Sequence, residues 1–324
     1  MKAVICREFG PYNTHKVEEI DPPAMKKGHV RVAVKAAGVN FPDILIVEGK
    51  YQFKPPFPFT PGAECSGEVT ELGEGVTGVS IGDKVFFGAT HGVFAEEVVV
   101  PAVQCFHIPD GMSFEQASAI NLVYGTSYHA LKDRARLQPG EKLLVLGAAG
   151  GVGLAAVELG KAMGATVIAA ASSDEKLAVC TEHGADLTLN YAGDVDLKKA
   201  IREVSGGGVD VIFDPVGDRF TEPAFRCLNW EGRHLVVGFA AGEIPKLPIN
   251  LALLKSAELR GVFWGAWLAR FPEAHRKNTE EYLQMFAEGK IRPRISNTYP
   301  LADFVKAYDE IAERRAMGKV VLTT

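Results

Sequence analysis

The amino-acid sequence predicts an α/β protein in which a doubly wound parallel sheet follows a mostly β domain. Between residues 30 and 100, apolar residues form short runs rich in β-formers, such as VRVAVKAAGV, separated by turn residues. This pattern is typical of a mixed, mostly antiparallel β domain. After about Ser113, six short apolar segments alternate with helical stretches. That alternation is typical of a parallel sheet with helices on both faces.

The elements of the second region follow from this alternation. The predicted strands are Lys142–Leu146, Thr166–Ala170, Leu187–Asn190, Val209–Asp214, His234–Val237 and Leu259–Phe263. Amphipathic helices are predicted between them, notably Val152–Met163 and Ser173–His183. From Trp264 the pattern resembles the margin of the first domain, with helices at Thr279–Glu288 and Leu301–Arg315 and a strand at Lys319–Leu322. We therefore expect a β domain over 1–120, a nucleotide-binding domain over 121–263, and a return to the first domain over 264–324.

Composition narrows the class of protein. The 324 residues are 47% hydrophobic and 23% charged, enough for two domain-sized cores. The net charge of −5 is spread in mixed sign, so we expect no nucleic-acid and no membrane partner. No apolar run is long enough for a bilayer, and the charged start MKAVICREFG is unlike a signal peptide, so we expect a cytoplasmic protein. The cysteines never form C-x-x-C, which predicts free thiols rather than disulfides or structural zinc.

A glycine-rich turn follows the first strand of the predicted parallel sheet. The stretch KLLVLGAAGGVGLAAVELGKAMGATVIAA has the order strand, turn, helix and strand that a dinucleotide site requires. Gly150 and Gly153 occupy the second and third glycine positions of the fingerprint, while Ala148 replaces the first. The helix N-terminus would offer free N–H groups to a pyrophosphate. The backbone predicted to bind it is Ala149, Gly150, Gly151, Val152 and Gly153; the alternative is a helix–strand contact that needs small residues.

The end of the second strand bears on the choice of nicotinamide nucleotide. An acidic side chain there would pair with the ribose hydroxyls and repel a 2′-phosphate. This strand ends in Ala170-Ala171-Ser172-Ser173, without an acid, and Lys176 follows in the next helix. We therefore expect Ser172, Ser173 and Lys176 to bind the 2′-phosphate of NADPH. The alternative is a capping box formed by Ser172 and Glu175, with a solvated Lys176.

Five short motifs occur in an order that resembles a known family. They are AAGVNFPD (36–43), PGAECSG (61–67), VSIGDKV (79–85), AAGGVG (148–153) and GKVV (318–321). Together they resemble the medium-chain dehydrogenase/reductase superfamily, and within it the zinc-independent quinone oxidoreductases related to zeta-crystallin. The resemblance covers essentially the whole chain and implies a GroES-like catalytic domain with a Rossmann domain.

The same resemblance implies chemistry without a metal. Zinc-dependent alcohol dehydrogenases have a cysteine at the position of Asn40 and a histidine at that of Ala63, and neither Asn nor Ala is a useful zinc ligand. Without a Lewis acid, the substrate must accept hydride through its own π system. Quinones and α,β-unsaturated carbonyl compounds do so.

Two catalytic residues are implied by the resemblance. Asn40 resembles the residue that lies beside the nicotinamide and hydrogen-bonds cofactor or substrate, although a turn asparagine after a strand would have the same sequence. Tyr51 matches a tyrosine that serves as proton donor in quinone reductases and enoyl thioester reductases. The alternative for Tyr51 is a packing role beside Phe53, Phe57 and Phe59.

Further cofactor contacts are implied by the resemblance. Lys176 and Tyr191, with Arg314 or Arg315, match residues that bind the 2′-phosphate. Thr126 matches a residue that approaches the cofactor near the start of the nucleotide-binding domain. The remaining matches lie at or after the ends of later strands, where ligands of open parallel sheets bind: Val216, Gly238, Phe239, Phe263 and Gly265.

These observations leave three functions open. The leading one is NADPH-dependent reduction of a small quinone or enone. The second is an enoyl thioester reductase of the acrylyl-CoA type. A cluster of Lys and Arg at the mouth of the cleft would support this function, whereas an apolar rim of Phe53, Phe57 and Trp264 would favour a quinone substrate. The third is a non-catalytic NADPH-binding protein similar to a lens crystallin.

The assembly is predicted from the last strand of the parallel sheet. We expect a homodimer in which Leu259–Phe263 pairs with its copy, because an exposed apolar edge invites aggregation unless it is covered. The alternative is that the C-terminal segment covers that edge within one chain.

Overall fold

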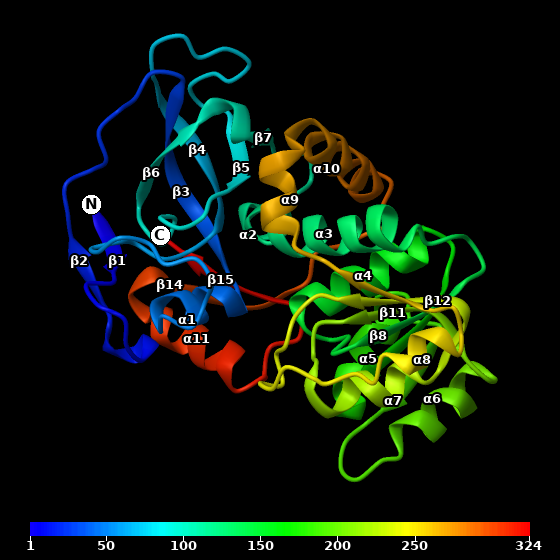
Figure 1. Ribbon diagram of the computed structural model, residues 1–324. Coiled ribbons are helices and arrows are strands. Elements are labelled where there is room, and N and C mark those ends of the chain that lie inside the picture. The colour runs from blue at the N-terminus through cyan, green and yellow to red at the C-terminus, as the bar shows by residue number, and fades with distance from the viewer. The chain divides into compact units, whose positions relative to one another are not determined.

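The computed structural model describes residues 1–324 and divides into two compact units (Figure 1). The first comprises Met1–Leu122 and Pro293–Thr324, and the second Val123–Arg292. The return to the first unit thus begins near Pro293 rather than at residue 264. Segment 264–292 stays in the second unit because Tyr282 packs with Tyr124 and Tyr128, at ring-centroid distances of 6.4 and 6.0 Å.

The second unit contains the doubly wound parallel sheet that the sequence predicts. Its strand order is β10-β9-β8-β11-β12-β13, and every pair is parallel. The strands are β8 (Lys142–Leu146), β9 (Thr166–Ala171), β10 (Leu187–Asn190), β11 (Val209–Asp214), β12 (Leu228–Val236) and β13 (Glu258–Gly261). The residues of β8 from Leu143 to Leu146 are fully buried, as expected of a central strand covered on both faces.

Helices precede, connect and follow these strands. They are α3 (Asn121–Tyr128), α4 (Gly151–Ala162), α5 (Asp174–Glu182), α6 (Leu197–Ser205), α7 (Thr221–Phe225), α8 (Asn250–Leu253), α9 (Trp264–Arg270) and α10 (Pro272–Ala287), with the short helical turns η3 (His129–Ala135) and η4 (Asp218–Phe220). The strand order reverses direction between β10 and β11. Because parallel crossovers are right-handed, α4 and α5 cover one face of the sheet and α6 and α7 the other. The reversal places a ligand crevice at the carboxyl ends of β8 and β11.

Two strands, β12 and β13, differ from their predicted bounds by more than one residue. β12 begins at Leu228, six residues before the predicted start at His234, and contains the exposed Trp230 and the left-handed Glu231 (φ 59°). β13 ends at Gly261 rather than Phe263, because Phe263 becomes the residue that precedes α9.

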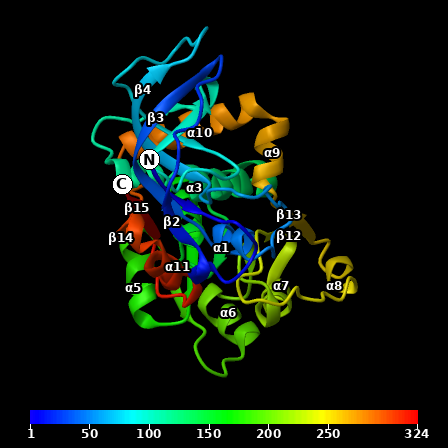
Figure 2. The same ribbon diagram turned by 90° about the vertical axis from the view of Figure 1, so that its left-hand side faces the viewer.

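The first unit is built on a mostly antiparallel sheet with the order β14-β15-β3-β4-β5-β7, to which β6 adds by pairing with β3. Its strands are β3 (His29–Val39), β4 (Glu64–Leu72), β5 (Lys84–Gly88), β6 (Glu97–Pro101), β7 (Phe106–His107), β14 (Ile295–Pro300) and β15 (Lys319–Thr323), and a separate pair joins β1 (Lys2–Ile5) to β2 (Lys16–Glu19). Figure 2 shows the long β3 and β4 of this unit. The mostly β domain predicted from the sequence is therefore confirmed, and the C-terminal strands complete its sheet.

Short helices flank this sheet: α1 (Phe41–Val47), α2 (Phe114–Ser118) and α11 (Phe304–Ala312), with the 3-10 turns η1 (Tyr12–Thr14), η2 (Ala102–Gln104) and η5 (Leu301–Asp303). α11 is shorter than the predicted Leu301–Arg315, because it follows η5 and the chain takes a left-handed conformation at Arg314 (φ 58°). α10 is longer than the predicted Thr279–Glu288, since Pro272 at its first position pre-sets the helical φ. Across the whole chain, no helix combines the length and apolar character needed to span a membrane.

Candidate functional site

The glycine turn between β8 and α4 has the geometry of a dinucleotide-binding turn. Gly147 takes the left-handed conformation (φ +60°), so it, rather than Ala148, makes the tight turn. A Cβ atom on Gly153 would lie 2.3 Å from the carbonyl oxygen of Gly147, which excludes any side chain at that position. Gly153 thus allows α4 to pack closely on the turn, as the third glycine of the fingerprint does.

Gly150 has a different environment. It precedes α4 without a side-chain cap, and a Cβ atom there would find only the Gly147 carbonyl oxygen, at 3.5 Å. Intrahelical bonding begins at the N–H of Leu154, which donates to Gly150 at 2.8 Å. The preceding N–H groups of Gly151, Val152 and Gly153 therefore remain directed out of the helix N-terminus, where the helix dipole favours an anion.

A buried carboxylate shapes the loop after β11. Asp214 Oδ1 accepts hydrogen bonds from the backbone N–H groups of Val216 (2.9 Å) and Gly217 (2.8 Å), and Oδ2 accepts from Thr221 Oγ1 (2.7 Å). The ring nitrogen Nε2 of His234 lies 3.1 Å from Oδ2. Burial opposes ionisation, but these hydrogen bonds outweigh it and hold the pKa of Asp214 below its usual range.

This loop lies against the glycine turn and against the loop after β12. A Cβ atom on Gly147 would lie 2.9 Å from Val216 Cγ2, and one on Gly217 would lie 2.8 Å from the Phe239 ring. The N–H of Gly238 donates to the Asp214 carbonyl at 3.3 Å. The structure thus brings three of the predicted residues, Val216, Gly238 and Phe239, to the carboxyl edge of the sheet beside the turn.

The end of β9 brings together three more predicted residues. Ser173 is the N-cap of α5, and its hydroxyl accepts from the Lys176 N–H at 3.3 Å, so the cap is Ser173 and not the Ser172–Glu175 box. Lys176 Nζ lies 3.4 Å from the Ser172 hydroxyl. The N–H of Tyr191 donates to the Ala171 carbonyl at 3.0 Å, which holds Tyr191 at the same edge.

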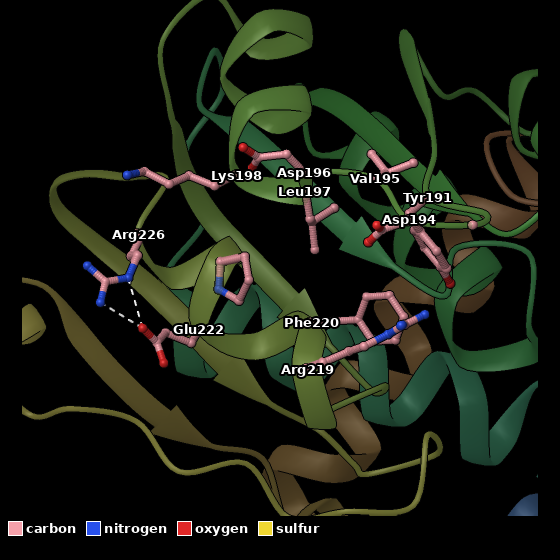
Figure 3. Close-up of a pocket in the computed structure, with 12 residues that line it drawn as sticks. Tyr191, Asp194, Val195, Asp196, Leu197, Lys198, Arg219, Phe220, Glu222 and Arg226 are labelled. Atoms are coloured by element: carbon pink, nitrogen blue, oxygen red, sulfur yellow. Dashed lines mark hydrogen bonds and ion pairs between the residues drawn. The ribbon is translucent and has the colours of Figure 1, made fainter.

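A pocket of about 300 Å³ lies beside Tyr191 in the second unit (Figure 3). The Tyr191 ring lies 5.0 Å from that of Phe220, centroid to centroid, and the Arg219 guanidinium lies 5.1 Å from the Phe220 centroid. Aromatic rings with a nearby guanidinium form a surface on which a flat ring such as a nucleotide base can stack. The lining also includes three carboxylates, those of Asp194, Asp196 and Glu222. Sequence reasoning identified Tyr191 but missed Arg219 and Phe220, which follow β11 by only a few residues.

The predicted residues near α3 and α9 also lie in the second unit. Gly125, next to Thr126, has the buried Trp264 against its backbone, where a Cβ atom would lie 2.6 Å from Trp264 Cζ2. Phe263 precedes α9 and is 61% exposed, so its side chain is open to a ligand or a partner. Gly265 follows in the first turn of α9. Trp264 is buried and does not contribute to an exposed apolar rim.

In the first unit, Asn40 lies in a buried polar cluster. Lys319 Nζ donates to Asn40 Oδ1 (2.6 Å), to Glu64 Oε1 (2.8 Å) and to the Val39 carbonyl (3.0 Å). Asn40 Nδ2 donates to Glu64 Oε1 at 2.9 Å and to the Gly38 carbonyl at 3.3 Å. All three side chains are at most 5% exposed.

Asp43 adds a second carboxylate to this cluster. Its Oδ2 accepts from the Asn40 N–H at 2.8 Å, while Oδ1 is buried without a hydrogen-bond partner. Burial, opposed by the Asn40 hydrogen bond and the Lys319 charge, raises the pKa of Asp43 to about 7. Asp43 therefore titrates near neutral pH, unlike an exposed aspartate.

Tyr51 packs on the apolar cluster of Cys6, Ile46, Val47 and Phe59 at the end of α1. Burial, followed by the charge of Asp43, raises the pKa of the Tyr51 phenol. The phenol thus keeps its proton at neutral pH. Both readings of Tyr51, packing and proton donation, agree with this environment.

Arg314 and Arg315 lie in the first unit, after α11. The Arg315 side chain forms ion pairs with Glu313 and Glu310, the latter with Nε at 3.8 Å from Oε1. Both arginines are exposed. At the positions that resemble zinc ligands, the structure has Asn40 in the cluster above and Ala63 beside Glu64, and it contains no group of three or more His, Cys, Asp or Glu side chains arranged to hold a metal ion.

Sequence reasoning assigned no role to Glu64, Lys319 and Asp43, which surround Asn40. All three stand in motifs that carried the resemblance: Asp43 in AAGVNFPD, Glu64 in PGAECSG and Lys319 in GKVV. The signal was present in those motifs, but the pairing of Lys319 with Glu64 joins positions 255 residues apart and has no local signature.

Comparisons with known proteins agree with this architecture. Residues 26–110 match the family model described as alcohol dehydrogenase GroES-like domain, and residues 151–283 match the one described as zinc-binding dehydrogenase. A quinone oxidoreductase-like protein 2 homolog of Nematostella vectensis is 39% identical over 100% of this chain and 89% of its own length.

Solved structures extend the comparison. The quinone oxidoreductase of Escherichia coli complexed with NADPH has a TM-score of 0.91 and 26% identity, with 100% of both chains covered. A mycobacterial protein complexed with NADPH also has a TM-score of 0.91, with 28% identity and 100% of both chains covered. With the two-unit fold, the glycine turn and the matched family models, these relatives show that the chain belongs to the medium-chain dehydrogenase/reductase superfamily, among its quinone oxidoreductase-like members.

Proposed function

We propose that this chain is an NADPH-dependent reductase that transfers hydride to a quinone or another conjugated carbonyl compound without a metal ion. The observation that carries the proposal is the carboxyl edge of the parallel sheet. There, a glycine turn with outward N–H groups lies in the same unit as an acid-free strand end that carries Ser172, Lys176 and Tyr191. Two solved relatives complexed with NADPH support this choice of cofactor.

The residues present fit such a cofactor. The N–H groups at the start of α4 would bind the pyrophosphate, and the absence of a Cβ atom at Gly150 leaves the approach open. Lys176, with Ser172 and Tyr191, would bind the 2′-phosphate, and the pocket beside Tyr191 would take the adjoining adenosine. When bound, NADPH supplies the hydride.

The residues of the first unit suit a substrate that can accept hydride without activation by a metal ion. With Asn40 and Ala63 at the positions that resemble zinc ligands, no Lewis acid would polarise an isolated ketone. A quinone or enone spreads the incoming charge over its own π system. Tyr51, whose phenol remains protonated at neutral pH, would then supply a proton to the reduced oxygen or enolate.

An exposed aromatic surface of the first unit favours a quinone over a CoA thioester. Phe53 and Phe57 are 40% and 43% exposed, and Phe9 lies 4.5 Å from Phe57, centroid to centroid. The cation beside them is Lys54, whose Nζ lies 5.7 Å from the Phe9 centroid. A carrier arm with several phosphates would require more positive charge than this surface has.

We also propose a cytoplasmic homodimer. The five cysteines are all buried and form no disulfide within the chain, which suits a reducing compartment. β13 forms one edge of its sheet; Leu259 within it is 53% exposed, and Phe263, two residues after its end, is 61% exposed. The C-terminal strands β14 and β15 belong to the other sheet, so the edge of β13 is not paired within the chain.

The test is NADPH oxidation against a panel of benzoquinones, naphthoquinones, enones and enoyl-CoA esters. We expect the highest kcat/KM with a quinone or enone. Preference for enoyl-CoA esters would identify the thioester reductase instead. NADPH binding without oxidation by any acceptor would identify a non-catalytic binding protein and refute the proposal.

A further inference from the structure

The loop after β11 carries Arg219 to the pocket beside Tyr191 in a defined backbone conformation. The buried Asp214 side chain accepts hydrogen bonds from the start of this loop. Asp218 then takes a left-handed conformation (φ 54°), and its N–H donates to the Glu243 carbonyl at 3.2 Å. The turn η4, which contains Arg219, follows directly. The position of Arg219 is therefore set by hydrogen bonds on the residues before it.

The Arg219 side chain presents an uncompensated guanidinium beside Tyr191. The guanidinium lies 5.1 Å from the Phe220 ring centroid, and that ring lies 5.0 Å from the Tyr191 ring. Figure 3 shows the Tyr191 hydroxyl and the Arg219 guanidinium at the same end of the pocket. Arg219 is exposed and forms no ion pair. Cation–π attraction to Phe220 thus orients the guanidinium while leaving its N–H groups available to a ligand.

Two of the three carboxylates that line the pocket are already engaged. Glu222 pairs with Arg226 at 2.7 Å, and Figure 3 shows this pair at the end of the pocket away from Tyr191. Asp196 Oδ1 accepts from the Lys199 N–H at 3.0 Å and so caps α6. The third carboxylate, that of Asp194, is exposed to solvent, which screens its charge.

Tyr191 connects this end of the pocket to the acid-free end of β9. Its N–H donates to the Ala171 carbonyl at 3.0 Å, and Lys176 Nζ lies 3.4 Å from the hydroxyl of Ser172, the next residue. Lys176 of α5 and Arg219 of η4 therefore lie on the two elements next to Tyr191. Their two positive charges exceed the single negative charge of Asp194, so this end of the pocket suits an anion.

The arginines after α11 are less suited to the same anion. Arg315 has ion pairs with both Glu310 and Glu313, which it would have to exchange for a phosphate. Arg314 and Arg315 also belong to the first unit, whereas Arg219 belongs to the second unit together with Ser172, Lys176 and Tyr191. The second unit thus contains two cations for a phosphate at the end of β9.

We propose that Arg219 is a specificity-determining residue that binds the 2′-phosphate of NADPH together with Lys176 and so contributes to the preference for NADPH over NADH. The inference rests on the proposed function in that it takes NADPH as the cofactor. A guanidinium can give two parallel hydrogen bonds to a phosphate, whereas the Lys176 ammonium acts as a point charge. Arg219 therefore adds directional recognition to the charge of Lys176.

The experiment compares two nucleotide fragments by titration calorimetry. The fragments 2′,5′-ADP and 5′-AMP share the adenosine and the 5′-phosphate and differ only in the 2′-phosphate. We expect wild-type protein to bind 2′,5′-ADP at least ~ten times more tightly than 5′-AMP. Arg219→Ala should weaken 2′,5′-ADP binding roughly fivefold or more and change 5′-AMP binding by less than about twofold. Because Arg219 is exposed and unpaired, this variant should keep the melting temperature of wild type.

Two further variants test the shared phosphate contact. Arg219→Lys keeps the charge but loses the planar fork, so its ratio of the two affinities should lie between those of wild type and Arg219→Ala. Combining Arg219→Ala with Lys176→Ala removes both cations and should bring the two fragments within about twofold of each other. A combined variant that still prefers 2′,5′-ADP as strongly as Lys176→Ala alone would overturn the role of Arg219.

The matched control is Arg226→Ala, which removes a guanidinium from the other end of the same pocket. Arg226 is already paired with Glu222, and both side chains are 39% exposed. Its replacement should change the ratio of the two affinities by less than about twofold, because solvent screens charges at that distance.

The outcomes separate this inference from the proposed function. An unchanged ratio in Arg219→Ala would overturn the inference and leave NADPH as the cofactor. Equal weakening of both fragments would mean that Arg219 serves the adenosine rather than the 2′-phosphate, which also overturns it. Equal binding of both fragments by wild-type protein would refute the choice of NADPH itself. Failure to oxidise NADPH with any acceptor would refute only the reductase, because the titration requires no turnover.

Discussion

Gly153 lies so close to Gly147 that a Cβ atom on Gly153 would be 2.3 Å from the Gly147 carbonyl oxygen, whereas a Cβ atom on Gly150 would be 3.5 Å from the same oxygen. The two glycines of the turn are thus required for different reasons. Gly153 is required by packing within the chain. Gly150, with ordinary β-region angles (φ −72°, ψ 165°), could be replaced without strain and is explained by a ligand that approaches its backbone.

This difference predicts separate effects of two alanine substitutions. Gly153→Ala should destabilise the fold by about 1–3 kcal/mol, as overpacking does. Gly150→Ala should leave the unfolding midpoint nearly unchanged and weaken NADPH binding about tenfold or more. Denaturant unfolding and fluorescence titration of NADPH measure the two effects. Equal destabilisation by both variants, or unchanged NADPH affinity of Gly150→Ala, would contradict this account of the turn.

Lys176 should distinguish NADPH from NADH. Because Lys176 lies beside Ser172 at an acid-free strand end, Lys176→Ala should weaken NADPH binding by at least ~1.4 kcal/mol, a factor of ten, and leave NADH nearly unchanged. Paired titrations of the two nucleotides provide the measurement. Lys161→Ala, which removes an exposed lysine paired with Asp186, is the control. A similar loss for both nucleotides would argue against a 2′-phosphate contact.

Activity should survive treatment with chelators. Asn40 is engaged with Lys319 and Glu64, and Ala63 has no ligand atom, so neither position would hold zinc. We expect elemental analysis of purified protein to give far less than one zinc per chain, and turnover to be the same before and after dialysis against a chelator. Stoichiometric zinc that leaves together with activity would refute this.

Asp43 should make stability fall as pH rises through the neutral range. Burial raises the folded-state pKa of Asp43 to about 7, from 3.8, so the folded protein holds this proton more tightly than the unfolded chain. The resulting stabilisation is complete below the unfolded pKa and is lost as pH rises through the folded one. Asp43→Asn removes that dependence.

Thermal unfolding of wild type and Asp43→Asn at about pH 5 and about pH 8 tests the direction of this pH dependence. The melting temperature of Asp43→Asn relative to wild type should be higher at the upper pH by several degrees, since all other titrating groups are shared and cancel. If the difference between the two melting temperatures is the same at both pH values, Asp43 does not titrate in this range.

The exposed edge of β13 predicts the oligomeric state. Light scattering should give about twice the chain mass of 34.9 kDa. A proline at Val262 would not test the interface cleanly, because the Val262 N–H donates to Val236 within the same sheet at 2.9 Å. Leu259→Lys, at a 53% exposed position, should instead give folded monomers, while Ile81→Lys, 65% exposed in the first unit, should leave the dimer intact. A wild-type mass near that of one chain would refute the dimer.

The elements predicted best from sequence are those fixed by local patterns. β10 and β11 have the predicted bounds because apolar runs end at turn residues on both sides. The start of β12 was missed because Asn229, Trp230 and Glu231 interrupt its apolar pattern, and pairing with neighbouring strands overrides that local signal. The Ser173 cap was displaced by one residue, within the usual uncertainty of a helix end.

The sequence predicted those parts of the site whose residues all lie in one short segment of the chain. The glycine turn, from Gly147 to Gly153, lies within a single strand–turn–helix unit and was identified from its spacing. The cluster around Asn40 joins β3, β4 and β15, so the partners of its amide become neighbours only when the C-terminal segment completes the first sheet.

The central claim is tested most directly by the initial rate at which the protein oxidises NADPH and NADH with a quinone acceptor, followed through the near-ultraviolet absorbance of the reduced nicotinamide. The account predicts oxidation that requires both protein and acceptor, with a kcat/KM for NADPH at least ~ten times that for NADH. Oxidation no faster than the uncatalysed reaction, or an equal or greater kcat/KM with NADH, would contradict it.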